Sequence, residues 1–125
     1  PQLENTPTLF WLDAHLPFVD FRKISYEESV RTYLQDAFPL EEELQLIIAQ
    51  RDYAKDVIII DDVLLYRENF DCEHLHSSGN FPHRDLVKEL GVKLSFDYVE
   101  EMFKGTHDIN FSNQHQGYCI ITPKI

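Results

Sequence analysis

Two short apolar runs dominate the pattern of the chain. Residues 57–60 are four consecutive β-branched apolar residues, and residues 8–12 form a second, partly aromatic run. The first run is too short for a helix and has no polar face, which is typical of a strand buried on both sides in a parallel sheet. We therefore predict two strands that belong to the interior of an α/β sheet.

The segment between the two strands predicts a helix that begins near Pro39. Proline suits the first helical position, and the three glutamates at 41–43 fall in the first turn, where the macrodipole favours negative charge. One face of this helix is apolar and is formed by Leu40, Leu44, Ile47 and Ile48. A crossover of this length can join parallel strands, and such crossovers are almost always right-handed.

The remainder of the chain predicts short helices, loops and a final hairpin. Ser25 and Ser95 are placed as N-caps, and Glu28 completes a capping box with Ser25. We expect helices at 25–38, 82–90 and 95–103, a helical turn at 63–66 and a loop at 69–80. The strands expected at 107–111 and 117–122 are joined by a short polar turn, which makes them antiparallel neighbours.

Acidic residues follow both apolar runs. Asp61 and Asp62 come directly after the strand at 57–60, and Asp13 follows the strand at 8–12, with His15 two residues later. The carboxyl ends of parallel strands form the ligand crevice of an open α/β sheet. A hard cation such as Mg²⁺ prefers carboxylate oxygens, so the three aspartates are candidate metal or substrate ligands. The alternative is that they cap turns and helices.

Composition limits the range of functions. With 125 residues, 43% of them hydrophobic, the chain has the size and apolar content of a single globular domain spanning residues 1–125. A formal net charge of -11 argues against nucleic acid or an anionic membrane as partner. No apolar run approaches the length of a membrane span, and no signal peptide opens the chain. Two cysteines, Cys72 and Cys119, are too few for a disulfide framework, so a cytoplasmic location is expected.

The cysteine and histidine residues offer a weaker metal hypothesis. Cys72, His74 and His76 alternate in a polar stretch, a spacing that suggests zinc but lacks a fourth ligand. A surface loop is the favoured interpretation. Cys119 lies inside a predicted strand, where we expect a small buried apolar residue.

Several motifs, taken together in their order, resemble a known family. They are Phe-Trp-Leu-Asp-Ala-His at 10–15, Pro-Leu-Glu-Glu-Glu-Leu at 39–44, Val-Ile-Ile-Ile-Asp-Asp at 57–62, Thr-His-Asp-Ile at 106–109 and Gln-Gly-Tyr at 116–118. This pattern resembles the carboxyl-terminal half of class I S-adenosylmethionine-dependent methyltransferases. The resemblance implies a Rossmann-like, mostly parallel, three-layer α/β fold. It also implies the strand order 8–12, 57–60, 117–122, 107–111, with the last strand antiparallel.

A wider likeness concerns the metal-dependent O-methyltransferases of the catechol and macrolide-sugar types. In those enzymes an aspartate after the fourth strand and an acidic pair after the fifth bind Mg²⁺, and Asp13, Asp61 and Asp62 stand at the matching places. The resemblance implies O-methylation of a small hydroxylated substrate such as a sugar, with His15 as base or positioning residue. This chain has neither the glycine-rich turn nor the acidic residue that bind S-adenosylmethionine, so we expect an incomplete cofactor site. Residues 16–38 would be an insertion.

The same resemblance bears on partners. In the complete fold the strand at 8–12 has a neighbour on both sides, and here one of them is missing. An apolar strand edge with no lysine or proline recruits another strand. We therefore expect the chain to pair through this edge with a second copy or with an amino-terminal half. Two other functions stay open, a non-catalytic binding domain and a metal-dependent hydrolase that uses the same aspartates.

Overall fold

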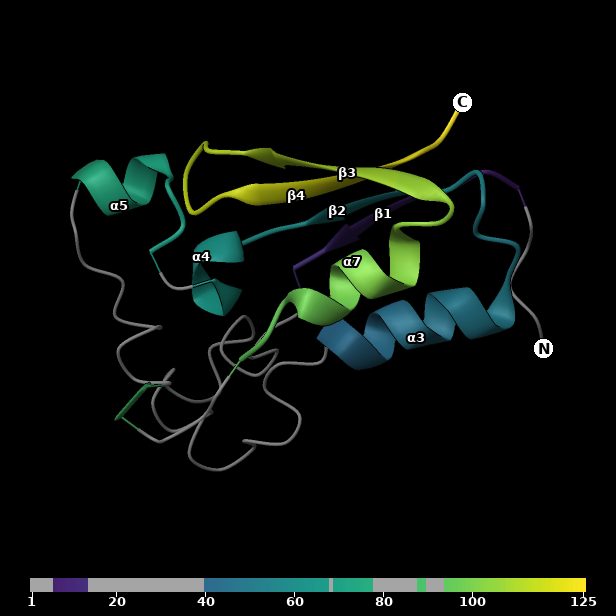
Figure 1. Ribbon diagram of the computed structural model, residues 1–125, viewed down its shortest axis with the longest axis horizontal. Coiled ribbons are helices and arrows are strands. Elements are labelled where there is room, and N and C mark those ends of the chain that lie inside the picture. The colour runs from purple at the N-terminus through teal and green to yellow at the C-terminus, as the bar shows by residue number, and fades with distance from the viewer. Residues whose placement is uncertain (1–5, 14–39, 68, 78–87, 90–93) are drawn as a thin grey trace, which may run out of the picture.

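The computed structural model describes residues 6–13, 40–67, 69–77, 88–89 and 94–125, which contain four strands and four helices (Figure 1). In chain order they are β1 (Leu9–Leu12), α3 (Leu40–Gln50), β2 (Val57–Ile60), α4 (Val63–Tyr66), α5 (Glu73–Ser77), α7 (Asp97–Phe103), β3 (His107–Ser112) and β4 (Tyr118–Pro123). The helix predicted at 25–38 lies outside the described residues, and so does the one at 82–90 except for two helical residues at 88–89.

The four strands form one open mixed sheet in the order β1-β2-β4-β3. β1 and β2 are parallel, and β4 is antiparallel to both of its neighbours. It follows that β1, β2 and β3 run in one direction and β4 in the other. The predicted strand order and the antiparallel last strand are confirmed, and the described part is a mixed α/β fold in which only one neighbouring pair is parallel.

One face of the sheet is covered by α3 and α7, which lie side by side below it in Figure 1. The alternation of the strands puts every second side chain on this face, and α3 contributes the apolar stripe that its sequence predicts. The buried core consists of residues from both helices, the two central strands β2 and β4, and the segments next to β2 and α7, namely Leu40, Leu44, Ile58, Ile60, Val63, Leu65, Tyr66, Phe96, Val99, Phe103, Cys119 and Ile121.

The opposite face of the sheet is apolar on β1 and β2 and is uncovered within the described part of the chain. Leu9 and Trp11 of β1 are 58% and 55% exposed. The strand register places Val57, Ile59 and Ile120 beside them, all partly exposed. β2 is therefore apolar toward both faces, as its sequence predicts, although only one face is packed by described residues.

A buried ion pair joins the starting ends of β1 and β2 to the end of α3. The Arg51 guanidinium binds both carboxylate oxygens of Asp56, at 2.7 and 2.9 Å, and the two side chains are only 4% and 0% exposed. The backbone N–H of Thr8 donates to the same carboxylate at 3.0 Å. A bidentate arginine–carboxylate pair is among the strongest side-chain contacts, and here it fixes where β1 begins against β2.

His107 adds β3 to the same end of the sheet. Its Nε2 lies 2.9 Å from the carbonyl oxygen of Asp56, and its Nδ1 lies 2.8 Å from the hydroxyl of Thr106. The imidazole is 1% exposed and stacks on the ring of Tyr53. Both ring nitrogens of this buried histidine thus have hydrogen-bond partners, which suits a structural role.

Two details of the sequence interpretation are wrong. The stretch 69–80, expected to be a loop, contains α5, because backbone N–H groups of Glu73 and His74 donate to carbonyls of Asn113 and His115 in the β3–β4 turn. Ser95 is not the N-cap of α7, because that position is Phe96. The Ser95 hydroxyl does accept a hydrogen bond from the backbone N–H of Asp97, but Ser95 lies one residue before the N-cap. The apolar pattern encodes neither the long-range contact that positions α5 nor the local geometry at Ser95.

The membrane prediction is tested by helix length. α3 is the longest of the described helices with 11 residues, and no helix in the described ranges is long and apolar enough to cross a bilayer.

Replacing Asp56 with alanine is expected to destabilise the fold by about 3–5 kcal/mol, because it removes the buried carboxylate that binds the Arg51 guanidinium through both oxygens. Chemical denaturation measures the change. Glu101→Ala is the matched control, since Glu101 is exposed on α7 and its loss changes the net charge equally. The free energy of unfolding of Glu101→Ala should change by no more than about 0.5 kcal/mol, as is usual for an exposed site. A change below about 1 kcal/mol for Asp56→Ala, or equal changes for both variants, would contradict the role of the pair.

Candidate metal site

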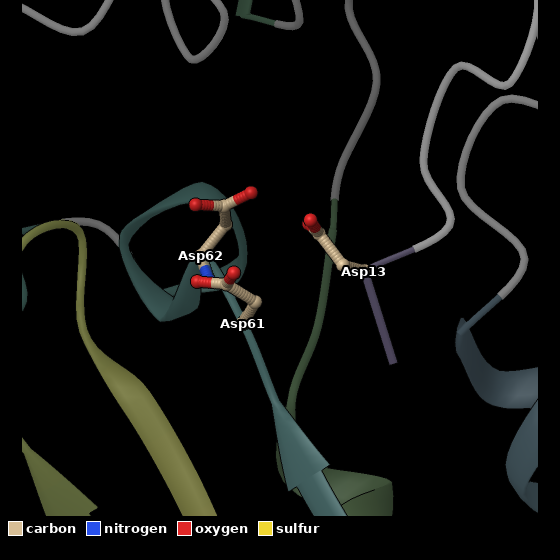
Figure 2. A group of neighbouring side chains, drawn as sticks. All are labelled: Asp13, Asp61 and Asp62. Atoms are coloured by element: carbon tan, nitrogen blue, oxygen red, sulfur yellow. The ribbon is translucent and has the colours of Figure 1, made fainter. Parts of the chain in front are cut away.

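Asp13 and Asp61 stand side by side because β1 and β2 are parallel and in register. Leu12 lies opposite Ile60, so the next residue of each strand is an aspartate at the same edge of the sheet. The backbone N–H of Asp61 donates to the Leu12 carbonyl at 3.1 Å and continues the ladder to the last residue. Figure 2 shows the Asp13 carboxylate facing Asp61 and Asp62 across this edge.

Asp62 is positioned by a tight turn between β2 and α4. Its backbone is in the left-handed region, with φ 57 and ψ 48, and its N–H donates to the Asp61 carboxylate at 2.7 Å. A left-handed conformation is uncommon for a residue other than glycine, although aspartate tolerates it better than most. Asp62 occupies the N-cap position of α4 but makes no side-chain capping hydrogen bond, so helix capping does not account for its carboxylate.

The end of the β3–β4 connection holds α4 in place below this turn. Carbonyl groups of Gln116 and Gly117 accept from the N–H groups of Leu64 and Val63 at 2.9 and 3.1 Å. Gly117 has φ +91, and a Cβ there would lie 2.6 Å from the Phe70 ring, so only glycine fits. The position of Asp62 thus depends on a hairpin that lies more than fifty residues later in the chain.

The three carboxylates form one cluster. Each offers an oxygen, and the chosen oxygens all lie within 4.8 Å of one another, with Asp13 exposed and Asp61 and Asp62 partly exposed. The predicted closeness of Asp13 and Asp61 at one edge of the sheet is confirmed. Three carboxylate oxygens at this spacing, open to water on one side, suit a hard divalent cation that keeps some of its water ligands. Their role as metal ligands stays a prediction.

Burial and the repulsion of neighbouring carboxylates make Asp62 a weaker acid. Burial raises the pKa of Asp62 to about 7, and the neighbouring charges of Asp61 and Asp13 act in the same direction. Because this folded-state pKa lies above the ordinary value of 3.8, the ionisation of Asp62 opposes folding increasingly as the pH rises from about 4 through 7. A bound cation would favour the ionised form and remove this cost.

Tyr118 is a neighbour of the cluster that the sequence interpretation did not single out as a site residue. The register of β4 against β2 places it beside Asp61. Its pKa is raised by partial burial and by the negative charges of Asp61, Asp62 and Asp13. The phenol therefore stays protonated and can donate a hydrogen bond at the edge of the site. The Gln-Gly-Tyr motif at 116–118 was the feature of the sequence that could have indicated Tyr118 as a site residue.

The remaining candidate residues either fall outside the described residues or do not belong to the cluster. His15 and the segment 16–38 are outside the described residues. Cys72 is 1% exposed, and His76 contacts Asp71. The only group of metal-binding side chains in the described ranges is the aspartate cluster, so the zinc hypothesis gains no support. Cys119 is fully buried in β4, as expected, and burial raises the pKa of its thiol to about 12.

Comparison with known proteins does not identify the chain: no model of a known family, no curated protein and no solved structure gives a significant match.

Magnesium binding is expected to depend on pH through Asp62. A cation must displace the proton that Asp62 holds with a pKa of about 7. The affinity measured by calorimetry should therefore be about tenfold weaker at pH 6 than at pH 8. In Asp62→Asn this pH dependence should disappear, and in Asp61→Asn binding should weaken at both pH values.

Asp71→Asn is the control, because Asp71 is an exposed aspartate outside the cluster. Equal loss of affinity in Asp71→Asn and Asp61→Asn, or binding by the unaltered chain that does not change with pH, would contradict the assignment of the site.

Proposed function

We propose that this chain is the carboxyl-terminal, metal-binding part of an S-adenosylmethionine-dependent O-methyltransferase domain that acts on a small hydroxylated substrate such as a sugar. The observation that carries the proposal is the cluster of Asp13, Asp61 and Asp62 at the carboxyl ends of two adjacent parallel strands. The strand order β1-β2-β4-β3, with β4 antiparallel, is the one that the family resemblance implies.

The donor set fits Mg²⁺. Asp13, Asp61 and Asp62 would hold the ion, which would supply Lewis acidity that lowers the pKa of a substrate hydroxyl. Two residues after Asp13, His15 is the candidate base for the proton that such a hydroxyl releases. Tyr118, kept protonated, would donate a hydrogen bond to a second substrate oxygen. These residues bind and orient a substrate with neighbouring hydroxyl groups.

S-adenosylmethionine does not fit this chain alone. The sequence contains no glycine-rich turn between a strand and a helix, and the described residues offer no substitute for one. We therefore assign methyl-donor binding to another polypeptide segment and derive no step that passes through the donor. The uncovered face of the sheet supports this division, because an apolar strand such as β2 is normally buried on both faces in a three-layer, Rossmann-like domain.

Two alternative functions do not involve a methyl donor. A metal-dependent hydrolase would use the same three aspartates, and a non-catalytic domain would use the sheet for binding. The strand order favours the methyltransferase interpretation over both. We also propose a cytoplasmic location, since the free, buried thiols of Cys72 and Cys119 are consistent with a reducing compartment.

Catechol is the probe for the proposed substrate chemistry, because it presents two adjacent hydroxyl groups. We expect catechol to bind in the presence of Mg²⁺, with NMR shifts at Asp61, Asp62 and Tyr118, and not to bind in its absence or in Asp61→Asn. S-adenosylmethionine at micromolar concentration should give no thermal shift.

Two results would decide against the proposal. Magnesium binding without any diol binding would leave a metal site but no O-methyltransferase site. A clear thermal shift with S-adenosylmethionine would show that residues 1–125 build a donor site themselves. Asp71→Asn again serves as the control, since it should bind catechol like the unaltered chain.

The chain is expected to associate through β1. Thr8 and Leu12 bond to β2 through their carbonyls, so the backbone groups of Leu9 and Trp11 point to the free edge, which has no strand partner among the described residues. Light scattering at tens of micromolar should give a mass above that of the monomer, and Leu9→Lys should reduce it.

Leu46→Lys is the matched control for this experiment, because Leu46 is also exposed (54%) but lies on α3. A monomeric mass for the unaltered chain in the absence of any added partner, together with no binding of an amino-terminal half, would exclude pairing through β1.

A further inference from the structure

A groove separates α7 from β3 on the side of the sheet away from β1. Its volume is about 510 Å³, and its walls include Phe96 and Val99 of the α7 segment and His107, Ile109 and Phe111 of β3. None of the three aspartates of the metal site lines it. The groove is therefore a second concave feature, separate from the proposed site and not used by it.

Backbone hydrogen-bonding groups of β3 open into this groove. The Lys124 N–H donates to the Thr106 carbonyl at 3.1 Å, so these two opposite residues form a hydrogen-bonded pair of the antiparallel ladder. Such pairs alternate with non-bonded ones along the strands. His107, Ile109 and Phe111 therefore direct their N–H and C=O groups away from β4. Within the described ranges β3 has a strand partner on one side only.

The proline at position 123 agrees with this register. Pro123 stands opposite His107, at a pair that exchanges no ladder hydrogen bonds with β3, so its missing N–H costs nothing there. The outer edge of β3 thus presents backbone donors and acceptors that have no strand partner among the described residues.

The groove floor is apolar and aromatic. Phe111 is 42% exposed, and its ring lies 6.2 Å from that of Phe96. Val99 is 1% exposed, and Ile109 packs against the core from the strand side. Phe96 and Val99 are buried, so the apolar surface that side chains of a strand added to β3 would meet on the α7 side is that of Ile109 and Phe111.

Cations stand at both ends of the groove. Lys104 and Lys124 lie where β3 begins, and Arg67 lies 4.9 Å above the Phe111 ring where β3 approaches its end. None of the three forms an ion pair within the described part of the chain, although the protein has twice as many acidic as basic residues. Asp97, Glu100 and Asp108 also line the groove, and no ion pair joins them to these cations within the described residues. Lys104 and Lys124, which lie together where β3 begins, are therefore available to a carboxylate of a bound segment.

We propose that the groove between α7 and β3 binds an extended segment of a partner polypeptide, which adds to the sheet as a strand beside β3. The segment carries apolar side chains at alternate positions toward α7 and an acidic residue or carboxyl terminus over Lys104 and Lys124. Main-chain hydrogen bonds to Ile109 and Phe111 give affinity, and the side chains of these two residues together with the two lysines give specificity. This inference does not depend on the proposed methyltransferase function.

The test uses a phage-displayed library of random heptapeptides selected on the intact chain. Enriched peptides should alternate apolar residues and carry an acidic residue at one end. Ile109→Pro removes the outward N–H, whereas Ile109→Ala removes the same side chain and keeps it. Peptides should bind Ile109→Pro about tenfold more weakly than Ile109→Ala, because one buried acceptor of the peptide loses its donor.

Methylation of the peptide backbone gives an independent readout if Ile109→Pro fails to fold. N-methyl groups at every second position should abolish binding, and those at the intervening positions should leave it unchanged. Replacing both Lys104 and Lys124 with glutamine should weaken binding of the acidic peptides, whereas Lys55→Gln, an exposed lysine outside the groove, should not.

Three results would overturn the proposal. These are failure to enrich any peptide, equal binding to Ile109→Pro and Ile109→Ala with no alternation in the N-methyl series, and NMR shifts that fall on the uncovered face of the sheet. A dimer that Ile109→Pro alone dissociates would mean that a second copy occupies the edge.

Discussion

The bidentate contact between Arg51 and Asp56 is the constraint on which the rest of the structure depends. The same carboxylate accepts the Thr8 N–H, so it sets which residue of β1 stands opposite the first residue of β2. Four residues later this register brings Asp13 beside Asp61. A shift by one residue would turn every side chain of β1 to the other face of the sheet and separate the two carboxylates. The buried salt bridge at one end of the sheet thus determines the geometry of the acidic cluster at the other.

The sequence predicts those parts of this arrangement that depend on the local order of apolar and polar residues. The run 57–60 identified β2 to the residue, the apolar stripe of α3 identified its buried face, and the acidic residues after both strands identified the cluster. What the sequence could not show are contacts between distant segments. α5 was missed because its first N–H groups are satisfied by the β3–β4 turn, and Tyr118 was missed because its place beside Asp61 follows from the pairing of β4 with β2. The strand order came from the family resemblance rather than from the pattern.

The cluster is built at a cost to stability. The fold holds Asp62 in a left-handed conformation beside two other carboxylates and burial raises its pKa to about 7, so the folded chain near neutral pH retains a partly protonated acid. A turn selected for stability alone would place asparagine or glycine at this position, since either tolerates the backbone and neither repels Asp61. Strain and like charge gathered at one point are typical of a ligand site, which supports a chemical role for the three aspartates more strongly than their number alone does.

The free edges of the sheet and the aspartate cluster lie at different places. Its edges are β1 and β3, on opposite sides, whereas the aspartates stand at the carboxyl ends of β1 and β2. A strand added beside β3 would be separated from β2 by β4 and β3 and would leave the cluster open to substrate. A partner beside β1 would instead lie next to Asp13 and could complete the crevice. Because Asp13 ends an edge strand, it is the one member of the cluster whose surroundings such a partner would change directly. The two edges are therefore suited to different tasks, β1 to completing the site and β3 to recruiting a polypeptide without disturbing it.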